Sequence, residues 1–115
     1  MALRYKNITI DQGSTFTSNV VAYVNSSSST VLPLTSYTAN AQIRKSYYHA
    51  NTAATFNVWI QDATAGIVNL VLNTANTSAM TDGAYVYDVM ITNSSTGVKT
   101  RIAEGVATVT PGVTR

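Results

Sequence analysis

The sequence predicts an all-β fold: a two-sheet antiparallel sandwich of about seven strands with one short helical turn. Apolar and polar residues alternate along most of the 115 residues, as they do in strands with one buried face. Clusters of Gly, Asn, Asp and Ser that favour turns recur about every ten residues. A lone sheet would leave its apolar face in water, so two sheets are expected to pack face to face.

The N-terminal third predicts two strands and a polar loop. Tyr5–Ile10 alternates as a first strand, and a glycine-containing turn separates it from a second strand at Thr15–Val24, which is rich in β-branched residues. Asn25–Thr30 contains four consecutive serines and is typical of a loop. Pro33 excludes a central strand at that point, and Leu34–Tyr37 is expected to bend so that its two end residues enter the core.

The middle of the chain predicts three more strands. Thr38–Ser46 is expected to be the third, and Tyr47–Ala54 to form the loop that follows it. Thr55–Gln61 and Ile67–Leu72 alternate as the fourth and fifth strands, and the glycine-containing turn between them predicts a β-hairpin.

The C-terminal third combines one helical segment with the strongest alternation. Asn73–Met80 is the one segment that suits a helix, with Thr74 as the expected N-cap. Ala84–Thr92 and Val98–Val109 predict a hairpin at the centre of one sheet, and Gly105 is the expected site of a bulge in the long last strand. Without a repeat or a linker, residues 1–115 are expected to form a single domain.

The surface is expected to be polar but weakly charged. Charged residues make up 10% of the chain, far below the usual quarter or so. Ser, Thr and Asn together make up roughly a third of it. Such a surface suits a protein that packs against neighbours, because burying Thr and Asn costs less than burying Lys and Glu. A composition bias of the source explains it equally well.

The charge distribution argues against nucleic-acid and membrane partners. The net charge is +2, and the seven basic residues are too scattered to form a basic patch. No run of apolar residues is long enough to span a bilayer. There is no cysteine, which excludes disulfides and thiolate metal sites. The first six residues lack an apolar run, so no signal peptide is expected, and the four Asn-x-Ser/Thr sequons are interpreted as chance.

Nothing in the sequence has the pattern of an enzyme or a metal site, and neither a catalytic residue nor a cofactor is predicted. His49, the one histidine, follows two tyrosines in a polar loop, and an enzyme would need it close to a carboxylate. Three aspartates adjoin predicted turns and are expected to cap backbone donors rather than bind Ca²⁺: Asp11, Asp62 and Asp82. Asp88 and Glu104 are expected to form cross-strand ion pairs with Arg101 or Arg44.

The aromatic residues divide into core and surface groups. Tyr85 and Tyr87 share one face of the predicted sixth strand with Val89 and Ile91 and are expected in the core or at its margin. Tyr47 and Tyr48 lie in a loop and suit an exposed contact. Trp59 alternates away from its apolar neighbours, so it packs either against a partner or beneath the helical segment.

Six segments, in this order, resemble the small immunoglobulin-like virion proteins of tailed phages, of which the N-terminal domain of baseplate upper proteins is a described family. Each segment alone is a weak signal, but the ordered set spans nearly the whole chain. The segments are Asp11–Phe16, Ala41–Ser46, Phe56–Ile60, Gly66–Leu70, Gly83–Asp88 and Val106–Pro111.

This resemblance implies an immunoglobulin-like sandwich that is a non-enzymatic part of a virion. Its partners would be other phage structural proteins in a symmetric assembly, with a homo-oligomer left open. The expected role is a tail, baseplate or neck adaptor; a capsid decoration protein on the head is the alternative. In the baseplate relatives this domain carries a receptor-binding arm, which is not expected here after Arg115.

Candidate contact residues follow from this interpretation. Chain ends and exposed loops of virion proteins often reach neighbouring subunits, which favours the two termini and the tyrosine loop. The candidates are Arg4, Lys6, Tyr47, Tyr48, His49, Trp59 and Arg115. A carbohydrate-binding module is a further alternative, and it would require Trp59, Tyr47 and Tyr48 on one exposed face.

Overall fold

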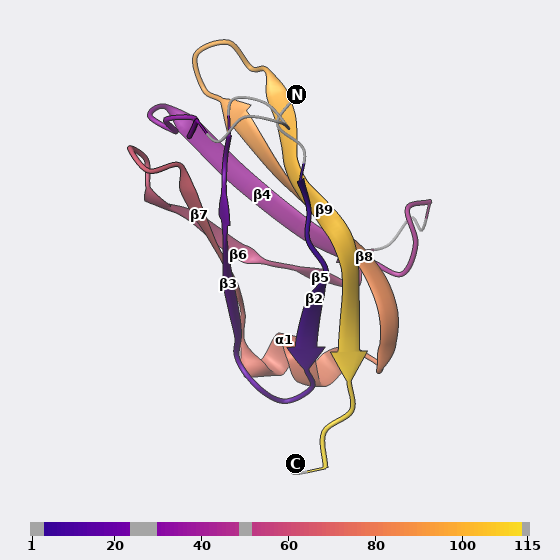
Figure 1. Cartoon of the computed structure of the whole chain (residues 1–115). Coiled ribbons are helices and arrows are strands. Elements are labelled where there is room, and N and C mark those ends of the chain that lie inside the picture. Colours follow the sequence, from indigo (N-terminus) through magenta and orange to yellow (C-terminus); the bar gives the residue numbers. More distant parts are fainter. Residues whose placement is uncertain (1–3, 24–29, 49–51, 114–115) are drawn as a thin grey trace.

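A computed structural model describes residues 4–23, 30–48 and 52–113, and it confirms the predicted two-sheet β-sandwich. Two sheets face each other, and one short helix lies at an end of the sandwich (Figure 1). The elements are β1 (Arg4–Tyr5), β2 (Ile8–Asp11), β3 (Phe16–Val21), β4 (Tyr37–Arg44), β5 (Ala54–Thr55), β6 (Asn57–Asp62), β7 (Ile67–Leu72), α1 (Thr74–Ala79), β8 (Gly83–Asn93) and β9 (Lys99–Thr110).

The larger sheet has six strands in the order β1-β9-β8-β4-β5, with β2 also paired to β9, and the smaller has the order β3-β7-β6. The β8–β9 hairpin lies at the centre of the larger sheet, as predicted. Two pairings differ from the antiparallel prediction, since β1 and β2 both run parallel to β9. No hairpin joins them: β2 leads into β3 of the other sheet, and the long connection permits the parallel direction.

Two predicted strands are each divided in two, which raises the described number to nine. The first breaks at Lys6 and Asn7, where the Asn7 Oδ1 atom accepts a hydrogen bond from the Val106 N–H at 3.1 Å. The fourth changes sheets at Phe56: the two residues before it pair with β4, and those after it pair with β7. The first break leaves both halves paired with β9, whereas the second places one chain segment in both sheets.

The bulge in β9 lies at Ile102 and not at Gly105, where it was predicted. Val89 is paired with Ala103 but Met90 with Arg101, so Ile102 is the extra residue. Both Ile102 and Ala103 are therefore buried, although they are neighbours in the sequence.

Gly105 has a different function from the predicted one. A Cβ atom at this position would overlap the Lys6 carbonyl group. The Tyr87 hydroxyl donates a hydrogen bond to the same carbonyl. Because Gly105 has no side chain, the backbone between β1 and β2 can lie close against β9.

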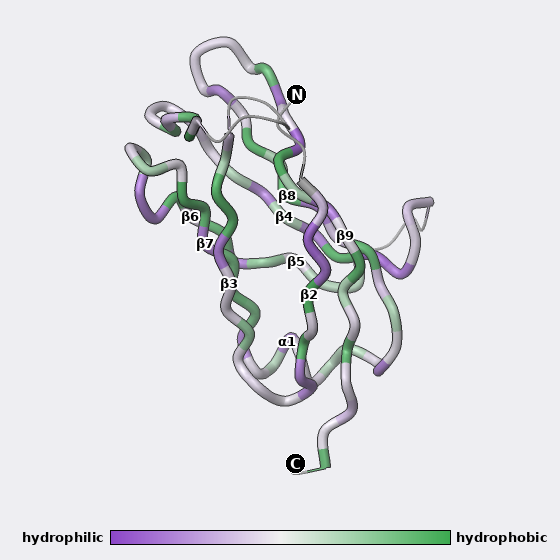
Figure 2. The backbone as a smooth tube through the Cα atoms, viewed as in Figure 1, coloured by the Kyte–Doolittle hydropathy of each residue, from purple (hydrophilic) through white to green (hydrophobic). Residues whose placement is uncertain are grey.

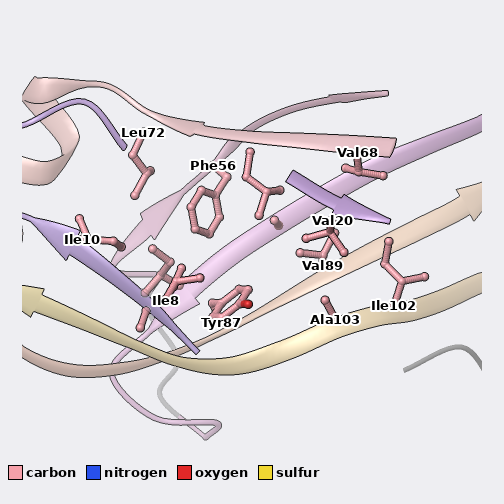
Figure 3. Close-up of a cluster of buried hydrophobic side chains, with 14 of the residues drawn as sticks. Ile8, Ile10, Val20, Phe56, Val68, Leu72, Tyr87, Val89, Ile102 and Ala103 are labelled. Carbon is pink, nitrogen blue, oxygen red and sulfur yellow. The ribbon is translucent and has the colours of Figure 1, made fainter. Parts of the chain in front are cut away.

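The core fills the space between the two sheets. Figure 2 shows hydrophobic and hydrophilic residues alternating along the strands, and Figure 3 shows the apolar side chains of both sheets meeting in the interior. The Phe56 ring lies at the centre, with its centroid 6.0 Å from that of Phe16 and 6.2 Å from that of Tyr87. Leu34 is buried and Tyr37 packs against the core, as expected for the bend before β4.

The helix α1 closes one end of the sandwich (Figure 1). Its N-cap is Asn73 and not Thr74, because the Asn73 Oδ1 atom accepts a hydrogen bond from the Asn76 N–H at 2.9 Å. Thr77 is buried and its hydroxyl donates to the Ser14 carbonyl oxygen at 2.9 Å. This six-residue helix is the one helix of the described residues, and none there could span a membrane.

Candidate functional site

The outer face of the six-stranded sheet carries a shallow groove across β4, β8 and β9. It consists of two adjoining hollows of about 370 and 360 Å³ that share Gln42, Asp88 and Met90. Further side chains of these strands, and one from the loop after β4, complete the lining. We call this the outer groove; its other lining residues include Asn40, Arg44, Tyr47, Val86, Thr92, Lys99 and Arg101.

Strand alternation places these side chains outside. In β8 the side chains of Tyr87 and Val89 point into the core, so the intervening Asp88 and its neighbours on the same face point outward. The register then aligns three polar residues across the sheet, since Gln42 is paired with Asp88 and Asp88 with Glu104. The floor of the outer groove is therefore polar at its centre.

One guanidinium group pairs with two carboxylates, that of Asp88 in the groove and that of the buried Glu104 beside it. The Arg101 Nε atom lies 3.4 Å from Asp88 Oδ2, and its Nη1 atom donates to Glu104 Oε2 at 3.4 Å. The Nε atom is buried but is not aligned for a hydrogen bond. The predicted cross-strand ion pair is confirmed between Arg101 and Asp88, whereas Arg101 and Glu104 pair within the same strand.

The bulge at Ile102 makes this arrangement possible. In a regular strand, residues three apart point to opposite faces, so Arg101 and Glu104 would be separated by the sheet. The extra residue turns Arg101 to the outer face, beside the carboxylate that it binds. Glu104 itself is only 7% exposed, so this ion pair neutralises a buried charge.

Burial raises the pKa of Asp88, and the charge of Glu104 raises it further, whereas Arg101 and Arg44 act in the opposite direction. Arg44 is itself held in place, since its Nη2 atom donates to Gln42 Oε1 at 3.1 Å. The outer groove thus contains a coupled set of charges rather than isolated surface groups.

The three aromatic residues that the carbohydrate-binding alternative requires do not share a face. Tyr47 is 63% exposed and lines the outer groove, and its neighbour Tyr48 is 98% exposed. Trp59 is 47% exposed on the outer side of β6, in the other sheet, opposite Asn69. The single aromatic face that the carbohydrate-binding alternative requires is therefore not formed.

The remaining predicted contact residues lie elsewhere. Lys6 makes internal contacts: its Nζ atom donates to Ser18 Oγ at 3.2 Å and to the Asn19 carbonyl oxygen at 3.1 Å. Arg4 lies in β1 and is paired with Ala103. His49 and Arg115 fall outside the described residues. Of the seven candidates, the structure places Tyr47 in the outer groove.

Sequence reasoning missed the central residues of the groove as a site. The outward alternation of Gln42, Asp88 and Met90 was visible, but the register that aligns them was not. Within the described ranges, no three His, Asp or Glu residues gather closely enough to hold a metal ion. Of the turn aspartates, Asp62 has the predicted capping role, since its Oδ1 atom accepts from the Ala65 N–H at 3.1 Å.

Comparisons with known proteins bear on the fold. No protein-family model matches the chain, and no curated protein matches it in sequence. Among solved structures, the NK cell receptor NKp44 is similar with a TM-score of 0.50 and 14% identity, covering 93% of this chain and 99% of that one. The N-terminal Ig1-2 module of the Drosophila receptor protein tyrosine phosphatase DLAR gives a TM-score of 0.47 and 16% identity over 95% of this chain.

This chain spans about half, 47%, of the DLAR module. At 14% identity, the likeness to NKp44 shows a shared immunoglobulin-like fold. The outer groove therefore has to be interpreted from its own residues.

Proposed function

We propose that this chain is a non-enzymatic protein-binding module that docks its partner on the outer groove. The observation that carries the proposal is the composition of that surface. Tyr47, Arg44, Arg101 and Met90 line one hollow, and Tyr, Arg and Met are the residue types enriched in protein interfaces. Hot spots in such interfaces are enriched in Tyr and Arg in particular.

The electrostatics of the groove favour binding over catalysis. Asp88, which lines the groove, and the buried Glu104 beside it are both paired with Arg101, so neither carboxylate is free to react with a substrate. General acid–base catalysis needs a group that can reach a substrate proton. A shallow surface with both polar and apolar lining residues suits the side chains of a protein partner better than a small substrate.

We place this module in the virion of a tailed phage, as an adaptor in the tail, baseplate or neck. The ordered resemblance of the six segments named above supports this setting. The low content of charged residues, 10%, supports it as well, since such a surface can be covered by repeated neighbours at little desolvation cost. Decoration of the capsid is the alternative position and has the same two supports.

Immunogold electron microscopy of purified particles tests the setting. An antibody to this chain is expected to label the tail tip or neck. Label over the head would replace the adaptor role with capsid decoration. Particles without label would overturn the virion setting, while leaving the protein-binding function of the outer groove to be tested separately.

Incorporation of variants into particles tests the binding face. Tyr47→Ala combined with Met90→Ala removes two side chains from the outer groove, and we expect at least about tenfold less protein per particle, the loss of roughly one hot spot. Trp59→Ala is the matched control on the other sheet and should be incorporated normally. Equal incorporation of both variants would contradict the assignment of the face.

A further inference from the structure

The outer edge of β3 is an unpaired strand edge in the smaller sheet. Within the described part of the chain, β3 pairs only with β7, through six consecutive residue pairs without a bulge. The Asn19 carbonyl oxygen accepts a hydrogen bond from the Lys6 Nζ atom, which shows that it points away from β7. The Ala22 N–H donates to the Gly66 carbonyl oxygen and therefore points to the opposite side. Alternation then directs the backbone groups of Thr17, Asn19 and Val21 to the free edge.

The other edge strands have features that oppose the addition of a further strand. The outer edge strand β6 has a bulge at Gln61, which twists the edge. The edge strand β5 is only two residues long, and the edge formed by β1 and β2 is broken at Lys6 and Asn7. Short or irregular edges are poor templates for pairing. The regular edge of β3 has none of these features.

Lys6 is held firmly on the larger sheet while its side chain reaches this edge. Its N–H donates to the Glu104 carbonyl oxygen at 2.9 Å, and its own carbonyl accepts from the Tyr87 hydroxyl. The Nζ atom then binds Ser18 Oγ and the Asn19 carbonyl oxygen on β3. The ammonium group thus occupies the central acceptor of the free edge and places a positive charge there.

We propose that Lys6 is a blocking residue that prevents the β3 edge from pairing with the β3 edge of a second copy of this chain. Residues 12–43 contain no Asp, Glu, Lys or Arg, so two such edges would meet without charge repulsion. A two-fold antiparallel pairing centred on Asn19 would place Thr17 of one copy opposite Val21 of the other. The Lys6 ammonium groups of both copies would lie at the centre of that contact and oppose it.

Sedimentation equilibrium of the whole chain and its variants tests this proposal. Lys6→Met keeps the side-chain length but removes the charge, and we expect the self-association constant to rise by about tenfold or more over the wild type. The product should have twice the 12.3 kDa mass of the chain. Lys45→Met is the control for loss of a lysine that lies neither at this edge nor in the outer groove, and it should behave as the wild type.

A second substitution locates the contact. Asn19→Pro removes an N–H group that points to the free edge, and it leaves the hydrogen bonds between β3 and β7 intact. The double variant with Lys6→Met and Asn19→Pro should therefore have the association constant of the wild type. Circular dichroism checks that each variant folds. If Lys6→Met does not fold, Lys6→Ser takes its place. A Lys6 variant that associates no more than the wild type, or an association that Asn19→Pro leaves unchanged, would overturn the proposal.

Discussion

The two faces of β8 have opposite chemistry. The inner face presents Tyr85, Tyr87, Val89 and Ile91, all 7% exposed or less, to the other sheet. The outer face presents the half-buried Asp88 and Met90 to the outer groove. One strand therefore supplies both buried apolar contacts of the core and the centre of the proposed binding surface.

This difference shows that fold and function place separate demands on one strand. Side chains on the inner face are fixed by packing, and most changes there should reduce stability. Side chains on the outer face are free of that demand, so charged groups can lie there, and Arg101 pairs with Asp88 and with the buried charge of Glu104. Substitutions that alternate along the strand should separate the two effects.

Ile91→Ala should have the largest effect on stability. Ile91 is fully buried, so its truncation removes apolar contacts and leaves a cavity. We expect a loss of about 3 to 4 kcal/mol in the free energy of unfolding. Urea denaturation measures it, with Thr92→Ala on the outer face as the control. Similar losses for the two variants would remove the distinction between the faces.

Gly105→Ala comes next, with an expected loss of about 2 to 3 kcal/mol from overpacking. The added methyl group would overlap the Lys6 carbonyl and push the β1–β2 break away from the sheet. Val106→Ala is the control, because Val106 is adjacent and exposed on the outer side. Equal stability of Gly105→Ala and the wild type would contradict the close contact between the Lys6 and Gly105 backbones.

Tyr87→Phe tests the polar contact of the inner face. Removing the hydroxyl takes a donor from the Lys6 carbonyl, and we expect a loss of about 1 to 2 kcal/mol at neutral pH. Burial raises the pKa of Tyr87 from 10.0 to about 12. The wild type should therefore lose stability as the pH rises from 10.0 toward 12, because unfolding releases this proton more readily.

Urea titrations between pH 9 and 12 measure this effect as the difference between wild type and variant. The difference in the free energy of unfolding between the wild type and Tyr87→Phe should become smaller across that range, since the variant lacks the titrating group. A deficit that stays constant with pH would contradict the burial of the Tyr87 hydroxyl.

Asp88→Asn should have the smallest effect, under about 1 kcal/mol, because the carboxyl is partly exposed and its charge is screened. The pKa of Asp88 is raised in the folded state, so its contribution to stability is present below the ordinary value of 3.8 and is lost as the pH rises through the raised pKa. Relative to Asp88→Asn, the wild type should lose stability between pH 4 and 7 in urea titrations. A relative gain would contradict the raised pKa.

Most of the fold was predictable from alternation, and the rest depended on contacts between distant segments. The sequence predicts the inward tyrosines of β8, the β6–β7 hairpin and the central β8–β9 hairpin, because each is a local pattern. The parallel pairing of β1 and β2 with β9 is a contact between the two ends of the chain. No local preference distinguishes it from an antiparallel edge.

The site was less predictable, for a physical reason. Its geometry depends on the bulge at Ile102, which brings Arg101 to the outer face, and the sequence favours a bulge at Gly105. The glycine at position 105 instead leaves room for the Lys6 carbonyl group, which lies close to the β9 backbone. The exposed Tyr47 was predictable from its loop, whereas its proximity to Met90 required the three-dimensional arrangement.

Site-specific photo-crosslinking is the measurement that tests the central claim most directly. A benzophenone side chain at Met90 reports on the outer groove, and one at Trp59 reports on the outer side of the smaller sheet. In assembled particles, or in producing cells if the particles carry no label, we expect crosslinks to one protein from Met90 and none from Trp59. Crosslinks from Trp59 with none from Met90 would contradict the assignment of the outer groove as the binding face.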